Sequence, residues 1–249
     1  MRIENSFIPV EGVGETTERR LWEAGVTTWE EFDGHVVGDR KAERIHRFVD
    51  TARERLDDGD ARYFRETFPS GCHWRCYDNF RAETCFLDIE TTGLDQRHHD
   101  VTVVSCHRAG ETTTLVADRD LTADRLQREL DDAKLLVTFN GKRFDVPFLE
   151  SAFDVSVEAP HVDLMYPCRR LDLTGGLKAI ERDVGIDRDR PDLSGEDAVR
   201  LWREYQRGDE NALETLVSYN RDDTANLRTL MELVANRLEP DQLATPKDS

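Results

Sequence analysis

The chain has 249 residues, 38% of them apolar, which suits one full domain beside a smaller one. No stretch approaches the roughly 18 apolar residues of a membrane span, and five scattered cysteines without a signal peptide predict a reduced, cytoplasmic protein rather than a secreted one. The net charge is −18, with 5 lysines and 29 arginines against 29 aspartates and 23 glutamates. We interpret this acidic, lysine-poor balance as adaptation to a salty cytoplasm, such as that of a halophilic archaeon. The alternative is an acidic protein that avoids nucleic acid.

Residues 1–60 are predicted to form a small all-helical module. A turn at Gly12-Val13-Gly14 leads into an amphipathic stretch, and Thr27 or Thr28 can cap a short helix behind it. Residues 39–56 carry the apolar stripe of a longer helix. The acidic run that follows this helix marks the end of the module.

Residues 61–83 form a connector that is rich in aromatic residues and shows no clear periodicity. An α/β pattern begins at residue 84. Strands are predicted at 84–90, 101–107, 112–117, 135–139 and 160–164. Helices are predicted at about 121–132, after Phe144, and through most of 176–238, with breaks near 186–193 and at Gly208. This order predicts an α/β domain at 84–240 with a mixed sheet flanked by helices, followed by a disordered tail at 241–249.

Asp88 and Glu90 are the first pair of candidate functional residues. They follow an apolar run and flank Ile89 on a predicted strand, so both carboxylates point to the same face. Two like charges held this close repel each other and pay a desolvation cost, which a bound divalent cation removes. The pair therefore predicts a metal site at this strand.

Two later segments carry similar chemistry. The run from Asn140 through Phe144 to Asp145 follows an apolar strand and opens a helix, the end of a strand where ligands gather. Tyr219 and Asp223 lie four residues apart on a predicted helix, so their side chains share one face. Each segment alone is commonplace, and a structural role would be the better interpretation of either one in isolation.

Together, the three segments resemble the DEDD superfamily of 3′-to-5′ exonucleases, whose ordered motifs are Asp-x-Glu, Asn-x-x-x-Phe/Tyr-Asp and Tyr-x-x-x-Asp. Residues 87–94 and 201–209 are similar to the YprB-like group of predicted exonucleases with an RNase H-like fold. The resemblance covers roughly residues 65–238. All seven histidines lie at or before His161, so Tyr219 is the candidate for the position ahead of the last aspartate, which indicates the tyrosine (DEDDy) subtype.

The resemblance implies an RNase H-like domain that hydrolyses phosphodiester bonds at the 3′ end of single-stranded nucleic acid. We favour DNA over RNA as the substrate and DNA repair as the setting, and the sequence itself leaves both the substrate and the pathway open. Two divalent cations, Mg²⁺ or Mn²⁺, suit carboxylate ligands and supply the chemistry. The expected ligands and catalytic residues are Asp88, Glu90, Asp145 and Asp223, with Tyr219 positioning the attacking water. The residues expected to line the substrate are Thr91, Thr92, Gly93, Leu94, Asn140 and Phe144. Asp163 is expected to brace the site.

The turn at Gly12, Val13 and Gly14 resembles a helix-hairpin-helix unit, in which backbone N–H groups bind a phosphate. It is a candidate for a duplex contact, and a purely structural or protein-docking module is the alternative. A zinc site at Cys72 and Cys76 lacks a second ligand pair.

Two other functions remain open from the sequence: a nucleic-acid- or partner-binding protein with little activity on a nuclease fold, and a structure-specific endonuclease that uses the same metals. The sequence leaves the oligomeric state open.

Overall fold

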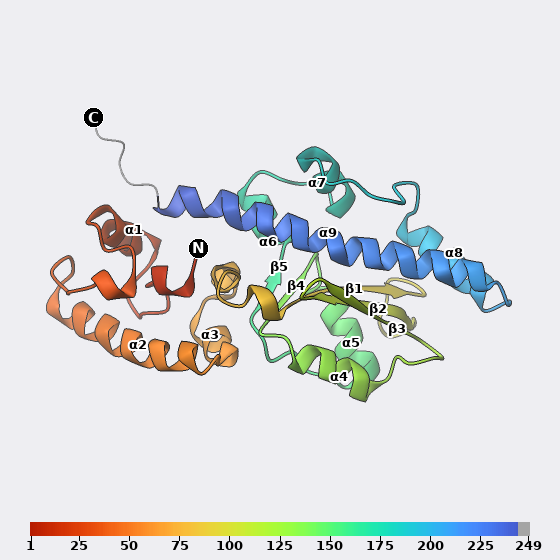
Figure 1. Cartoon of the computed structure of the whole chain (residues 1–249), viewed down its shortest axis with the longest axis horizontal. Helices are drawn as coiled ribbons and strands as arrows, with labels where there is room; N and C mark the ends of the chain where they lie inside the picture. The colour runs from red at the N-terminus through yellow and green to blue at the C-terminus, as the bar shows by residue number, and fades with distance from the viewer. Residues whose placement is uncertain (244–249) are drawn as a thin grey trace.

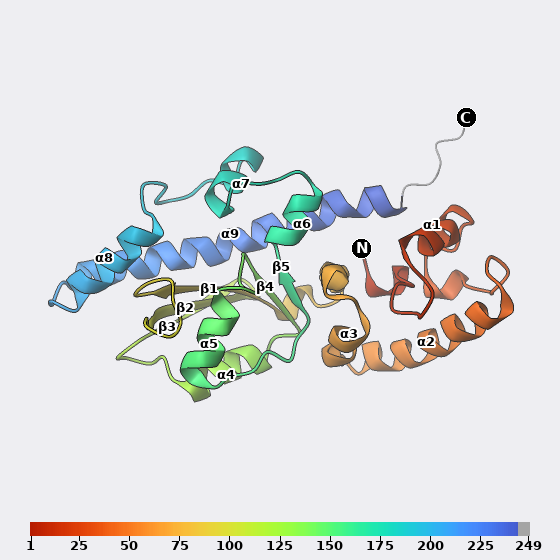
Figure 2. The same ribbon diagram turned by 180° about the vertical axis from the view of Figure 1, so that it is seen from behind.

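The protein is represented by a computed structural model that describes residues 1–243, with side chains described through Glu239. A sheet flanked by helices forms one part of the molecule, and a helical N-terminal part lies beside it (Figure 1). The long helix α9 (Glu210–Leu243) runs across the sheet and ends next to the N-terminal part, a placement also visible from behind (Figure 2).

The sheet has five strands in the order β3-β2-β1-β4-β5. Their bounds are β1 Thr84–Thr91, β2 Val101–Arg108, β3 Glu111–Val116, β4 Leu135–Thr138 and β5 His161–Asp163. β1 pairs antiparallel with β2 and parallel with β4, while β2–β3 is antiparallel and β4–β5 parallel. The predicted mixed sheet flanked by helices is confirmed.

The central strand β1 buries both of its faces. Its odd-numbered residues Cys85, Leu87 and Ile89 pack in one apolar cluster with α4 (Ala123–Asp131) and α5 (Asp145–Phe153). Phe86, which points the other way, joins the cluster that contains apolar residues of α9. The α4–α5 pair and α9 therefore cover opposite faces of the sheet (Figures 1 and 2). Phe86 and Asp88, two even-numbered residues of β1, both lie toward α9.

The C-terminal helices break where the sequence predicts. α7 (Leu177–Val184) is capped by Gly185, α8 (Gly195–Tyr205) begins after a Ser194 cap, and α9 begins just after Gly208. A short helix, α6 (Met165–Arg170), follows β5 and was not predicted. The helix α9 continues to its described end within the predicted tail of 241–249, so 241–243 are helical and 244–249 lie outside the described residues.

The N-terminal part is all-helical, as predicted for residues 1–60, and the connector at 61–83, for which no element was predicted, is helical as well. Its elements are η1 Ile3–Asn5, α1 Glu15–Glu23, η2 Trp29–Glu31, α2 Asp39–Asp57, α3 Ala61–Thr67, η3 Ser70–Cys76 and η4 Arg81–Glu83. The helix expected after Thr28 is a single 3₁₀ turn, because the chain becomes extended again at Phe32. The aperiodic connector contains a helix, α3, capped by Asp60.

One apolar cluster joins the N-terminal part to the sheet domain. It includes Met1 and Phe7, aromatic residues of the connector such as Trp74, and Leu230 and Val234 of α9. The division of the chain at residues 60 and 83 stays a prediction. In the described part of the chain, no helix is both long and apolar enough to cross a membrane.

Candidate metal centre and active site

Three of the predicted carboxylates meet where β1 faces α9. Asp88, Glu90 and Asp223 each offer a ligand oxygen, and these oxygens lie within 4.8 Å of one another. Among the described residues, this is the cluster of three or more acidic, histidine or cysteine side chains that could hold a metal ion. The two strand residues lie on the face that the alternation of β1 predicts, and the helix supplies the third.

The register of β1 changes within this cluster. Glu90 lies opposite Val103 and Thr91 opposite Val101, so β2 contributes an extra residue between them. A β-bulge of this kind re-aims side chains and is common beside active sites. Here it lies directly after the second carboxylate, at the point where the strand leads into the predicted substrate loop.

Asp145, the fourth predicted carboxylate, is the first residue of α5 and is only 4% exposed. Burial raises its pKa well above the usual range, and the neighbouring Asp88 raises it further. Burial likewise raises the pKa of Asp88 to about 7, and burial followed by the charges of Asp88 and Asp145 raises that of Glu90. Asp145 therefore lies close enough for its charge to act on Glu90, but it is not among the carboxylates whose oxygens meet within 4.8 Å. Carboxylate oxygens are the ligands that Mg²⁺ and Mn²⁺ prefer.

Tyr219 lies one helical turn before Asp223 and is largely buried. Burial, followed by the charges of Glu90 and Asp88, raises its pKa to about 12. Lys178 Nζ lies 5.1 Å and Arg188 Cζ 5.7 Å from the centre of its ring. At neutral pH the phenol therefore keeps its proton, so it can orient a water molecule but cannot act as a base.

Three residues at this site were not predicted from the sequence. Asn220 Nδ2 donates a hydrogen bond of 2.7 Å to Asp88 Oδ2. Arg188 forms ion pairs with both Asp223 and Glu181. Asn220 directly follows Tyr219, so its position in the third motif was an available signal, whereas Arg188 lies between α7 and α8 in a segment without periodicity.

The predicted substrate loop forms one wall of a groove next to the carboxylates. The groove has a volume of about 650 Å³, and its other wall is the start of α8. The predicted residues that line it are Glu90, Thr91, Gly93, Leu94 and Phe144. Leu94 is 85% exposed, the most exposed large apolar side chain of the described residues, and presents a free apolar surface to the groove.

Hydrogen bonds shape this loop. The Thr91 hydroxyl donates to the Gly93 carbonyl (2.6 Å), and Thr92 is paired through its backbone and hydroxyl with Asp100. Thr92 is not among the groove residues. A Cβ at Gly93 would lie 2.3 Å from the His99 ring, so the close approach of this histidine requires glycine.

The second loop, after β4, is held by Asp163, the residue that was predicted to brace the site. Its carboxylate accepts the backbone N–H groups of Asn140 (2.7 Å), Lys142 (3.2 Å) and Met165 (3.2 Å). Asn140 adopts a left-handed conformation with φ of 63°, which asparagine tolerates better than most residues. The structure gives it a role in the turn that positions Asp145, and it does not line the groove.

The turn at Gly12, Val13 and Gly14 lies far along the chain from this site, directly before α1. Arg44 approaches it but is engaged by Glu11, through the carbonyl at 3.3 Å and the carboxylate at 3.5 Å. Contact between the turn and nucleic acid stays a prediction.

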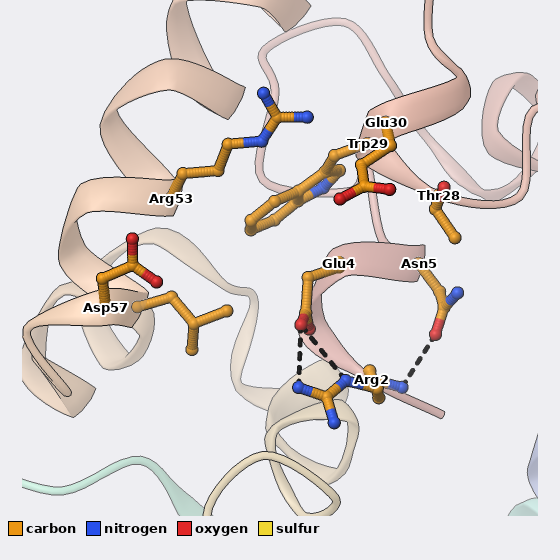
Figure 3. Close-up of a pocket in the computed structure, with 9 residues that line it drawn as sticks. Arg2, Glu4, Asn5, Thr28, Trp29, Glu30, Arg53 and Asp57 are labelled. Carbon is orange, nitrogen blue, oxygen red and sulfur yellow. Dashed lines mark hydrogen bonds and ion pairs between the residues drawn. The ribbon is translucent and has the colours of Figure 1, made fainter.

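A separate hollow of about 440 Å³ lies elsewhere in the N-terminal part, between η1, η2 and α2 (Figure 3). Its Arg2 is paired with Glu4, and Arg53 faces it together with Glu30 and Asp57. This mixture of opposite charges does not favour a phosphate ligand.

The zinc alternative is not supported within the described residues. Cys72 and Cys76 are buried free thiols, and burial raises the pKa of both. Neither belongs to a cluster that could hold a metal ion.

Comparisons with known proteins agree with this architecture. The sequence profile of the RNase H superfamily matches residues 85–235, more than half of the chain. A comparison with curated proteins finds no match. Among solved structures, the family B DNA polymerase from the hyperthermophilic archaeon Pyrobaculum calidifontis is similar over 63% of this chain and 24% of the polymerase, with a TM-score of 0.50 and 20% identity. At that identity the likeness concerns the fold alone.

Two further solved structures are similar at lower scores. One is a nuclease in its apo form, which is similar with a TM-score of 0.49 and 20% identity over 66% of this chain and 77% of the nuclease. The other is Brucella melitensis NrnC, with a TM-score of 0.35 and 17% identity over 70% of this chain and 92% of that one.

Proposed function

Because the chain belongs to the RNase H superfamily, we propose that it is a metal-dependent 3′-to-5′ exonuclease of the tyrosine DEDD subtype, in the YprB-like group. It hydrolyses phosphodiester bonds at the 3′ end of single-stranded nucleic acid, with DNA favoured over RNA. The observation that carries this proposal is the meeting of Asp88, Glu90 and Asp223 within 4.8 Å, beside the buried Asp145. The direction of hydrolysis and the single-stranded substrate rest on the resemblance of the three motifs.

The side chains present suit two divalent cations, Mg²⁺ or Mn²⁺. Asp88, Glu90 and Asp223, with Asp145 directly or through water, would hold them. When bound, such cations lower the pKa of a coordinated water and neutralise the charge that develops on the phosphate. Without a counter-charge, burial favours the protonated form of these carboxylates, as their raised pKa values indicate.

The protein's own residues orient the reactants. Asn220 holds one oxygen of Asp88 by a hydrogen bond. The protonated Tyr219 hydroxyl, next to Glu90 and Asp88, orients the attacking water by hydrogen bonding. The groove along Thr91, Gly93 and Leu94 receives the terminal nucleotide, whose base rests on the exposed leucine.

The setting of this activity is also part of the proposal. The acidic surface suits work in a high-salt cytoplasm, where a Debye length of about 3 Å at molar salt removes long-range repulsion of a polyanion. Removal of 3′ ends suits DNA repair. The N-terminal part is proposed to contact a duplex beside the end that is degraded.

A strand-degradation assay tests the proposal. Purified protein in Mn²⁺ or Mg²⁺ and high potassium chloride is expected to shorten a 5′-labelled single strand stepwise from its 3′ end. Asp88→Asn is expected to lower the rate at least about 1,000-fold, because it removes a charge from the metal ligands while preserving the shape of the side chain. Circular dichroism and the melting temperature check that the variant is folded.

The products distinguish the alternatives. Internal cleavage products that appear before any ladder would identify a structure-specific endonuclease. Binding of the strand without hydrolysis, across both metals and both nucleic acids, would identify a binding protein on a nuclease fold. Matched DNA and RNA strands decide between the two substrates.

A further inference from the structure

Arg188 is buried among the acidic side chains of the site, although it comes from the irregular segment between α7 and α8. One end of its guanidinium group, Nη1, donates to Glu181, and the other, Nη2, donates to Asp223. The side chain of Arg188 is 7% exposed, that of Asp223 9% and that of Glu181 0%. The three charges are therefore almost fully removed from water.

Stability alone does not account for this arrangement. Burying three charges costs more than packing apolar groups of similar size, unless every polar atom is satisfied. The second carboxylate oxygen of Glu181, Oε1, is buried and has no hydrogen-bond partner among residues 1–239. The chain thus retains a buried, incompletely paired glutamate whose one strong contact is to Arg188.

The position of the guanidinium group indicates a role in binding substrate. Arg188 contacts a proposed metal ligand, Asp223, and its Cζ lies 5.7 Å from the ring centre of Tyr219. It therefore contacts both the residue proposed to hold a cation and the residue proposed to orient water. A guanidinium group binds phosphate oxygens in the same geometry as it binds carboxylates.

We propose that Arg188 is a phosphate-binding residue of this site, held in place by Glu181. While no cation is bound, its Nη2 covers Asp223. When Asp223 engages a cation, Nη2 turns to a nonbridging oxygen of the substrate phosphate, while Nη1 remains on Glu181. Because the two carboxylates use different nitrogens, one contact can be exchanged without loss of the other. This inference rests on the proposed nuclease function.

The arrangement also addresses how a protein of charge −18 attracts a polyanion. Arg188 holds its positive charge inside the site, paired with acidic groups, whereas arginines such as Arg62 and Arg182 are exposed. It becomes available to the phosphate when Asp223 is neutralised by a cation. Glu181 acts through Arg188 and is a positioning residue.

Two affinities measured on Arg188→Gln test the proposal. Titration calorimetry with Mn²⁺ alone is expected to show about 10-fold tighter binding, since Asp223 no longer has to leave an ion pair. Fluorescence anisotropy at saturating Mn²⁺, with a single-stranded oligonucleotide whose terminal phosphorothioate slows hydrolysis, is expected to show about 10-fold weaker binding. Opposite changes in the two affinities cannot arise from misfolding, which would weaken both.

Arg182→Gln is the matched control. Arg182 lies on α7, its side chain is 79% exposed, and the substitution removes the same charge from the surface. Both affinities are expected to match those of the wild type. Arg188→Lys keeps the positive charge but lacks the two guanidinium nitrogens that contact two partners at once. We expect both of its affinities to be intermediate, and it replaces Arg188→Gln in the test if the glutamine variant does not fold.

A double-mutant cycle tests the positioning role of Glu181. Glu181→Gln is expected to weaken oligonucleotide binding, and the double variant with Arg188→Gln is expected to bind no more weakly than Arg188→Gln alone. Additive losses would exclude positioning through Arg188. Unchanged oligonucleotide affinity in Arg188→Gln, or weaker binding of both Mn²⁺ and the oligonucleotide, would overturn the proposed role of Arg188. Neither outcome would contradict the proposed nuclease function, which cleavage by the wild type tests. A wild-type protein that neither cleaves nor binds the strand would overturn the proposed function itself, and this inference with it.

Discussion

Tyr219 shows how burial determines what a single side chain can do. The charges of Glu90 and Asp88 act on its hydroxyl, and the cationic side chains of Lys178 and Arg188 lie over its ring. Desolvation is the largest cause of its raised pKa of about 12. A phenol with that pKa remains protonated across the physiological range. In the proposed reaction it would therefore contribute by orientation, through a hydroxyl that can donate to or accept from water.

Tyr219→Phe removes this hydroxyl and keeps the ring. We expect kcat to fall about 100-fold, the cost of a misplaced nucleophile, with Mn²⁺ affinity unchanged, because the tyrosine is not among the proposed ligands. Rates between pH 6 and 9 should be reduced by a constant factor, since the phenol does not titrate there. A variant that is as active as the wild type would show that the hydroxyl has no part in the reaction.

Among the elements, those with a regular repeat could be predicted from the sequence. Alternation in β1 predicted that Asp88 and Glu90 share a face, and four-residue spacing on α9 predicted that Tyr219 and Asp223 do. Arg188 could not be found in this way. It lies in a segment without periodicity, and its contact with Asp223 depends on how α7 and α8 pack against α9.

The connector provides a second example. Its helix α3 is only seven residues long, and its aromatic side chains face several neighbours instead of one stripe. Phe64, for example, contacts both Phe68 and Phe80 at centroid distances of 6.2 Å. A segment buried from several directions lacks an amphipathic pattern, so its structure is set by tertiary packing.

The contact between η3 and the edge strand β5 predicts how the stability of the protein depends on pH. The His161 backbone N–H donates to His73 Nδ1 (3.2 Å), and His161 Nε2 pairs with the Thr138 hydroxyl (2.8 Å). Burial lowers the pKa of His161 to about 3. Below about pH 6.5 the unfolded chain therefore binds a proton at this residue that the native state does not, so stability falls as the pH falls.

His161→Gln removes this linkage and retains a polar side chain near Thr138. We expect the wild type to lose about 2 kcal/mol more unfolding free energy than the variant between pH 7.5 and pH 5. Urea denaturation at both pH values measures the difference, and other titrating groups cancel in the comparison. Equal losses in the two proteins would mean that His161 becomes protonated without unfolding.

At the scale of the whole molecule, the net charge of −18 acts on folding as well as on binding. Repulsion among acidic side chains destabilises the compact state, and salt screens it. We expect the melting temperature to rise by about 5 °C or more between 0.1 and 2 M potassium chloride, which corresponds to roughly 1–2 kcal/mol for a chain of this size. A non-ionic osmolyte at equal osmolality is the control, and a flat or falling melting temperature in salt would contradict the prediction.

The apolar cluster shared by Met1, Phe7 and the end of α9 has a consequence for any attempt to shorten the protein. The same helix presents Asp223 near its middle and, two to three turns closer to its C-terminal end, apolar residues that include Leu230 and Val234. Starting the chain after residue 60 would uncover these apolar residues while leaving every proposed catalytic residue in place. Such a fragment would keep all of the proposed catalytic residues but would expose the apolar residues of α9 that the N-terminal part covers. We expect it to self-associate through this apolar surface, so it would not serve as a minimal nuclease.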